Sequence, residues 1–240
     1  MTNNHVASAA HLSCASCGQL LTGAYYVMID RSESYCVACI TTRPRCDSCG
    51  APLTTQSWRL HDGRSQCAHC HHTAIYDPAV AQQLYDETMQ AVISHLGLSL
   101  KVGVEFRLAD APTLQAVRRL SDDRPAEPGP PTLGLYQRQG HIRAIYILYG
   151  LPRLLFRITV AHEYAHAWQG EHCPLLQDHI LREGFAEWVA YRHMLWLGAG
   201  RAANRMLQGN HPYRPMLEHV LKMEAELGTV GLFAYMRTAE

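Results

Sequence analysis

The stretch A-H-E-Y-A-H-A-W, residues 161–168, contains the motif H-E-x-x-H, in which two histidines stand one helical turn apart with a glutamate between them. Histidines at this spacing are zinc ligands, and the intervening glutamate is placed to act as a general base. Apolar residues recur at helical spacing through residues 158–168, which predicts a buried or cleft-lining helix. The alternative is a helix whose histidines only pack, so the interpretation depends on the surrounding sequence.

Composition limits the possible classes of protein. A chain of 240 residues with 48% hydrophobic content can bury one sizeable core and a small additional module. Its 21 basic and 21 acidic residues cancel, so no overall field favours nucleic acid or an anionic membrane. The most apolar region, residues 144–161, is interrupted by Pro152, Arg153 and Arg157, which argues against a membrane span. Residues 1–13 carry no signal-peptide pattern and are expected to be disordered, so we expect a cytoplasmic protein.

Eight of the nine cysteines form four C-x-x-C pairs, with eighteen residues between the first two pairs and seventeen between the last two. Each pair can direct two thiolates at one ion, and two pairs complete a tetrahedral site that has no open position. The spacing therefore predicts two structural zinc ions. The first set is Cys14, Cys17, Cys36 and Cys39, and the second is Cys46, Cys49, Cys67 and Cys70. Cys173 is left over.

The cysteine pairs belong to an internal duplication, which we expect to form a module over residues 14–75. Gly18 and Gly50 directly follow the first pair of each half, and residues 25–29 and 57–60 are predicted strands. A module this small is held together by its metal, so zinc binding and folding should be one event. Redox activity is the weaker interpretation, because a thioredoxin-like pair would occur once. Histidines 69, 71 and 72 could replace a cysteine ligand.

Residues 76–240 are predicted to form a mainly helical domain with a small sheet. The pattern indicates a linker helix over residues 78–96, a strand near 100–108 and a helix near 112–120. Residues 122–131, which are rich in proline and charge, are expected to form a mobile surface loop. Two strands over 132–137 and 141–148 then precede the motif helix. The fold class is therefore α+β, and a sheet followed by a metal-binding helix suits a zincin.

A catalytic zinc needs a third protein ligand and an open position for water. His172 lies six residues after His166, as in metzincins, but the glycine that this class requires is misplaced. Glu183 lies in a helix-forming stretch of the kind from which Glu-zincins present a carboxylate, which favours it. Glu187, one turn further, could be the ligand, but it fits better as an acceptor that orients a ligating histidine.

Several segments together resemble the DA-one family, the LIM-domain metallopeptidases that restrict organ size in plants. The resemblance is carried by H-E-x-x-H-A-W at residues 162–168, by G-L-P-R-L-L at 150–155 and by E-G at 183–184. Shorter segments at residues 62–70, 97–102 and 217–220 follow in the same order, so the match extends from about Cys46 onward. One departure concerns the linker between the two zinc sites, which is two residues in LIM domains but spans residues 40–45 here.

The resemblance implies a zinc metallopeptidase with a LIM-like module of tandem zinc ribbons. It carries the two histidine ligands over to His162 and His166, the third ligand to Glu183 and the catalytic carboxylate to Glu163. We therefore expect one catalytic and two structural zinc ions, and an enzyme, with endopeptidase activity favoured, that cleaves a protein or peptide substrate. The LIM-like module is expected to bind a substrate or partner protein, with no nucleic-acid or membrane partner. The alternative is a catalytically silent LIM-like zinc adaptor.

Overall fold

The structure is a computed structural model that describes residues 12–28, 33–121, 132–140, 142–208 and 212–240. The chain divides into two compact units, Met1–His71 and His72–Glu240. The mobile loop expected over residues 122–131 falls outside the described residues, as does the disordered segment expected over residues 1–13 except for its last two residues. Of these two, Ser13 forms a β-bridge with Leu20. Among the helices of the described residues, none is both long and apolar enough to cross a bilayer.

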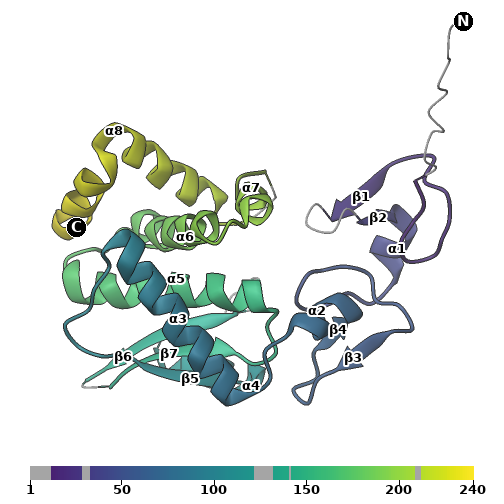
Figure 1. Cartoon of the computed structure of the whole chain (residues 1–240), viewed down its shortest axis with the longest axis horizontal. Coiled ribbons are helices and arrows are strands. Elements are labelled where there is room, and N and C mark those ends of the chain that lie inside the picture. The colour runs from purple at the N-terminus through teal and green to yellow at the C-terminus, as the bar shows by residue number, and fades with distance from the viewer. Residues whose placement is uncertain (1–11, 29–32, 122–131, 141, 209–211) are drawn as a thin grey trace, which may run out of the picture. The chain divides into compact units, whose positions relative to one another are not determined.

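The first unit repeats one small motif, an antiparallel hairpin followed by a short helix (Figure 1). The first copy consists of β1 (Tyr25–Met28), β2 (Glu33–Cys36) and α1 (Val37–Thr42), and the second of β3 (Ser57–Arg59), β4 (Ser65–Cys67) and α2 (Ala68–Thr73). The strands predicted over residues 25–29 and 57–60 correspond to β1 and β3, the first strand of each hairpin. The helices α1 and α2 were not anticipated, because six residues are too few to show a helical period.

The second unit combines a three-stranded sheet with six helices in the described residues. In chain order these are α3 (Pro78–Leu96), β5 (Glu105–Ala109), α4 (Ala111–Ser121), β6 (Gly134–Gln139), β7 (Ile142–Leu148), α5 (Arg153–His172), α6 (His179–Trp196), α7 (Gly200–Gln208) and α8 (Arg214–Thr238). The central strand β7 pairs in parallel with β5 and antiparallel with β6, so β6 is an edge strand. The expected mixture of helices and a small sheet is confirmed.

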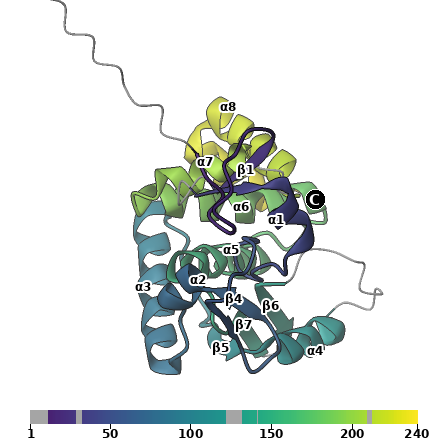
Figure 2. The same ribbon diagram turned by 90° about the vertical axis from the view of Figure 1, so that its right-hand side faces the viewer.

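Helix α5 is the centre of this unit. It lies over the sheet, α6 packs against it, and α8 packs against α6, as Figures 1 and 2 show from two directions. The helix is apolar on most of its surface because it is covered from both sides. Aromatic rings fill the space between the three helices, with Trp168 of α5, Phe185 and Trp188 of α6 and Phe233 of α8 in mutual contact.

Local sequence signals mark where α3 begins and ends and where α6 begins. Asp77 caps α3 through hydrogen bonds from the N–H groups of Ala79 and Val80, and Pro78 occupies the first turn. Gly97 closes that helix in the left-handed conformation with φ of 72°. Asp178 caps α6 by accepting from the N–H groups of the second and third residues that follow it. These caps fix where α6 begins and hence where Glu183 lies along it.

Gly184 sets the distance between α6 and α8. A Cβ atom at this position would lie 2.5 Å from the carbonyl oxygen of Met216 and 2.9 Å from Val220. Only glycine allows the start of α8 to approach so closely, because the obstructing atom belongs to the backbone. Since Gly184 directly follows Glu183, this contact fixes the turn of α6 that carries the glutamate.

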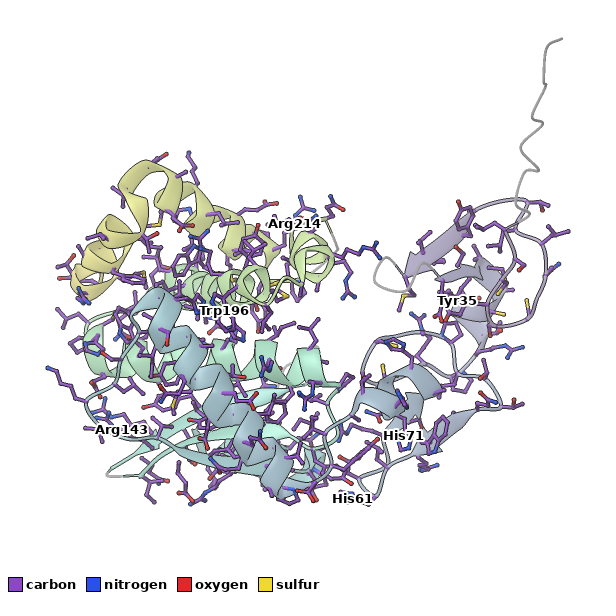
Figure 3. The ribbon with its side chains drawn as sticks, viewed as in Figure 1. Tyr35, His61, His71, Arg143, Trp196 and Arg214 are labelled. Atoms are coloured by element: carbon purple, nitrogen blue, oxygen red, sulfur yellow. The ribbon has the colours of Figure 1, made fainter. Side chains whose placement is uncertain are left out.

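Titration of a buried histidine should make the stability of this fold depend on pH. His193 of α6 is 0% exposed, and neither of its ring nitrogens has a hydrogen-bond partner among the described residues. Its ring stacks on Trp196, a residue labelled in Figure 3, and lies 5.7 Å from the ring of His95 of α3. Burial, together with the charges of His95 and Arg157, lowers the pKa of His193 from 6.5 to about 4.

The unfolded chain therefore takes up this proton before the folded chain does, so the free energy of unfolding falls as pH drops from 6.5 to 4 and is unaffected above 6.5. Between pH 6.5 and 4, the free energy of unfolding of His193→Leu should therefore fall by roughly 3 kcal/mol less than that of the wild type. Denaturant unfolding at fixed free zinc, measured across this pH range, checks the prediction. The exposed residue change His219→Leu serves as the control and should leave the slope unchanged. Equal slopes for wild type and His193→Leu would contradict it.

Candidate metal centres

The eight paired cysteines gather into two groups of four, each within the first unit. In each group the four sulfur atoms lie within 4.8 Å of one another. The Sγ atoms of Cys17 and Cys36 are 3.9 Å apart and those of Cys49 and Cys67 are 3.8 Å apart. Tetrahedral zinc with Zn–S bonds of about 2.3 Å separates its ligands by about 3.8 Å. All nine cysteines lie in the described residues and none forms a disulfide, so both groups are free to hold an ion.

The backbone around each cluster favours the thiolate form that a metal requires. The N–H of Cys36 points at Sγ of Cys14 at 3.3 Å, and in the second copy the N–H of Cys67 points at Sγ of Cys46 at 3.4 Å. Burial raises the pKa of Cys14, but hydrogen bonds from the main-chain N–H groups of Cys36, Cys17 and Ser16, with a smaller contribution from the Cys17 side chain, outweigh it and lower the pKa to about 6. His71, which was considered as a replacement ligand, instead stacks on Trp58 with ring centroids 4.5 Å apart.

A third group joins α5 to α6 in the second unit. His162 and His166 come from α5 and Glu183 from α6, and one ligand atom of each lies within 4.8 Å of the others. The two Nε2 atoms are 3.1 Å apart, and Oε2 of Glu183 lies 3.6 Å from the first and 3.5 Å from the second. Tetrahedral zinc with bonds of about 2.05 Å would separate such atoms by about 3.3 Å. The nitrogen and oxygen donors therefore fit a zinc ion.

Two further residues hold the imidazole rings with their Nε2 atoms toward the common point. Oε1 of Gln169 lies 2.9 Å from Nδ1 of His166, and Nε2 of Gln169 donates to the carbonyl oxygen of Arg182 at 2.9 Å. Oε1 of Glu187 lies 3.3 Å from Nδ1 of His162. Because Nδ1–H donates to these acceptors, each Nε2 is left with a lone pair for a metal. Glu187 thus lies where an orienting acceptor was expected.

The charges in this site depend on one another. Burial raises the pKa of Glu183, but hydrogen bonds with His162 and His166 lower it far more, so the carboxylate is ionised. Burial lowers the pKa of His162, whereas Glu183 and Glu187 raise it well above 6.5. The carboxylates therefore attract positive charge to this point, whether a proton or a metal ion supplies it. The side chains of both histidines are 16% exposed, so solvent reaches the cluster.

Glu163 faces the edge of the sheet. Its Oε2 accepts a hydrogen bond of 2.8 Å from the main-chain N–H of Tyr136 in β6, and the residue is 7% exposed. The carboxylate thus lies on the metal-site helix, between the two histidines in sequence, and is fixed by a neighbouring strand. The motif alone indicates Glu163 as a general base, whereas no sequence pattern indicates its partner in β6.

The third-ligand candidate His172 lies outside the three-residue cluster, whereas two further residues lie beside it. His172 directs Nε2 to the carbonyl oxygen of Ser99 at 3.1 Å and is not part of the three-residue cluster. His179, one turn before Glu183, has Nδ1 3.9 Å from Oε1 of that glutamate. Tyr213, which sequence analysis missed, precedes α8, and its ring lies 6.4 Å from that of His162. Burial and the charges of Glu183 and Glu187 raise the pKa of Tyr213.

Comparison with known proteins gives a consistent match over this region. Residues 133–211 match the family described as DA1-like: Protein DA1. Protein DA1 of Arabidopsis thaliana is 29% identical over 194 residues, which cover 67% of the chain and 35% of that relative. Protein DA1-related 1 of the same plant is 31% identical over 190 residues, covering 64% of the chain and 33% of the relative. LIM domain-containing protein HDR3 of Oryza sativa subsp. japonica is 27% identical over 158 residues, which cover 52% of the chain and 31% of that relative.

The chain thus spans about a third of the length of these curated relatives. No solved structure matches the chain significantly.

Metal analysis checks the three clusters directly. We expect three zinc ions per wild-type chain, and two after Glu183→Ala, because two imidazoles alone hold zinc weakly. Elemental analysis after identical purification gives the ratio. The change Glu226→Ala, at an exposed position of α8, is the control and should leave three. A wild-type ratio of two would contradict the interpretation of the third cluster.

Gln169→Met tests the orientation of His166 separately. The change keeps the side-chain volume but removes the acceptor at Nδ1, so zinc affinity at this centre should fall by about 10- to 100-fold. Competition with a chromogenic zinc chelator measures the affinity. Gln90→Met, at an exposed position of α3, is the matched control. Unchanged affinity in Gln169→Met would show that the hydrogen bond is dispensable.

Proposed function

The chain belongs to the DA1-like family, and from this premise we propose that it is a zinc-dependent metallopeptidase with a LIM-like zinc module. The observation that carries the proposal is the convergence of His162, His166 and Glu183 on one solvent-accessible point, with Glu163 on the same helix as the histidines. Three protein ligands and an open position are the pattern of catalytic zinc sites, whereas structural sites are closed.

The arrangement of elements supports a zincin-like fold of the Glu-zincin type. The helix with both histidines lies over a small sheet whose edge strand β6 runs beside it, and the next helix provides the glutamate. His162 and His166 would hold zinc through Nε2 and Glu183 through a carboxylate oxygen. A zinc ion supplies Lewis acidity, which lowers the pKa of a water toward about 7 and polarises a carbonyl group.

Glu163 is the proposed proton carrier. A carboxylate next to the metal ligands would accept the proton of the attacking water and pass it to the leaving amine. Its Oε2 is already fixed by the N–H of Tyr136, so little reorganisation is needed before reaction. Gln169 and Glu187 keep the imidazoles in the tautomer that the metal requires.

The edge strand supports a peptide as the substrate. Along an edge strand, the main-chain groups of successive residues point alternately toward and away from the neighbouring strand. Leu133, just before β6, accepts from the N–H of Leu148 in β7, whereas the N–H of Tyr136 points to the other side, where it donates to Glu163. Alternate residues of β6 therefore direct their main-chain groups away from β7. Extended peptides bind such edges by adding a strand. A substrate aligned along β6 would cross the region of Glu163, which favours internal peptide bonds as the target and hence endopeptidase activity.

The LIM-like module is proposed to bind a protein, either the substrate or a regulatory partner. Strand β1 exposes apolar side chains on both faces of its hairpin, Tyr25 at 45% and Val27 at 49% on one face and Tyr26 at 51% on the other. Exposed apolar side chains on a two-stranded sheet are sites to which another polypeptide can bind. The same surface would serve the alternative function, that of a zinc adaptor without turnover, so the two functions are separated by Glu163.

Glu163→Gln should lower kcat at least 100-fold while all three zinc ions are retained, because the change removes the proton acceptor but no metal ligand. The measurement is cleavage of a peptide library derived from a proteome, with products identified by mass spectrometry and zinc determined on the same samples. Glu226→Gln, an exposed change on α8, is the matched control.

Two results would overturn this function. Turnover by Glu163→Gln at the wild-type rate would exclude Glu163 as the base. A wild-type protein with three zinc ions that cleaves no peptide in the library, and no protein in a cell extract, would favour the adaptor.

A further inference from the structure

The carboxylate of Glu163 is enclosed by the start of β6. Its Oε2 accepts from the N–H of Tyr136 at 2.8 Å, and its other side faces Gly134, two residues earlier on the same strand. A Cβ atom at Gly134 would lie 2.8 Å from Cγ and 3.0 Å from Oε1 of Glu163. Real Cβ contacts essentially never become as short as the first of these, so any side chain at position 134 would push the carboxylate away.

Thr159, one turn before Glu163 on α5, also leaves no room for a side chain at position 134. Its Cγ2 would lie 2.6 Å from a Cβ at Gly134. The methyl group cannot easily turn aside, because the Thr159 hydroxyl donates to the carbonyl oxygen of Leu155 at 2.8 Å and this bond fixes the side-chain rotamer. Two consecutive turns of the metal-site helix therefore touch one glycine of the strand.

The position of β6 is fixed independently of Glu163. Pairing with β7 places Gly134 opposite Ile147 and Tyr136 opposite Ile145, both of which are completely buried. Further along, Arg138 donates from Nη1 to the carbonyl oxygen of Gly170 at 2.7 Å, near the end of α5. The strand is thus attached to the sheet on one side and to the helix at its far end, so it is a rigid support for the carboxylate.

We propose that Gly134 and the main-chain N–H of Tyr136 are positioning residues for Glu163, the first by permitting close approach of the strand and the second by holding Oε2. The inference rests on the proposed function, because it concerns the orientation of the proposed base. Gly134 matters for its lack of a side chain and Tyr136 for its backbone, which is why a search for chemically active side chains overlooks both.

The first test compares Gly134→Ala with Gly103→Ala. Gly103 is the matched control because a Cβ there meets nothing within 4 Å and its backbone conformation suits alanine. Gly134→Ala should lower kcat by on the order of 100-fold, since a shift of about 1 Å in a reacting group has an effect of this size. KM should stay within about threefold and three zinc ions should remain. Gly103→Ala should match the wild type in all three measurements.

The N–H of Tyr136 can be removed alone by replacing Tyr136 with its α-hydroxy acid analogue through nonsense suppression. This change converts one amide to an ester and keeps the phenol. Because the N–H points away from β7, pairing in the sheet is retained, and kcat should fall with zinc content unchanged.

A thermal double-mutant cycle tests the contact without reference to catalysis. Gly134→Ala should lower Tm by about 5 °C in the wild-type background, because the added methyl overpacks a buried contact. The loss should shrink by at least half in Thr159→Ser, which lacks Cγ2, and in Glu163→Ala, which lacks Cγ. In the double variant Gly134→Ala/Thr159→Ser, Tm should recover while kcat stays low, because Glu163 is still displaced.

The results separate this inference from the proposed function. If the wild type is active in a Glu163-dependent manner and Gly134→Ala keeps wild-type kcat, the positioning role fails and the function stands. Recovery of kcat together with Tm in Gly134→Ala/Thr159→Ser would also overturn it, since the effect would then be one of stability. A wild type without Glu163-dependent turnover would overturn the proposed function. If the Tm losses of Gly134→Ala and of the α5 variants simply add in the double variants, position 134 does not contact Thr159 and Glu163 in the way proposed.

Discussion

The Nε2 atoms of His162 and His166 lie 3.1 Å apart and both face one carboxylate oxygen of Glu183. Two imidazoles that direct lone pairs at the same point repel each other, so positive charge between them, whether from a proton or a metal ion, stabilises this arrangement. The neighbouring residues of the second unit act to the same effect. Helix α5 carries both rings, α6 carries the opposing charge, and Gln169 and Glu187 hold the rings from behind.

Glycines allow the polar groups of the site to meet inside an apolar core. Gly134 brings the edge strand within hydrogen-bonding distance of Glu163, and Gly184 brings α8 onto the turn of α6 that carries Glu183. At both positions a Cβ would lie under 3.0 Å from neighbouring atoms. The carboxylate of Glu163 is thus held directly by backbone, whereas Glu183 is held through the fixed turn of α6 that carries it and through the side chains around it.

The two units are stabilised by different physical means. In the first, the main buried cluster consists of Cys14, Tyr35, Cys39 and Ala51, so the apolar surface available to it is small. Metal binding at the two cysteine groups therefore has to provide what a core would otherwise provide. In the second, a continuous core extends from Ile75 to Met236, so burial of apolar surface can stabilise this unit without a metal. This difference predicts that a chelator unfolds the first unit while the second keeps its secondary structure.

Sequence alone was sufficient wherever a feature is local or periodic. The cysteine pairs and the motif at His162 and His166 each lie within one or two turns of chain, so spacing identifies them. Among the acidic residues that follow the motif, Glu183 was favoured by its helix-forming stretch, and the family resemblance indicated the same residue. The neighbours of Glu163 and the isolation of His193 arise from packing between elements far apart in the chain, and neither glycine nor a main-chain N–H carries a chemical signature. The paired cysteines and the two motif histidines were thus determined by spacing, whereas the orientation of the Glu163 carboxylate was decided by how closely β6 packs on α5.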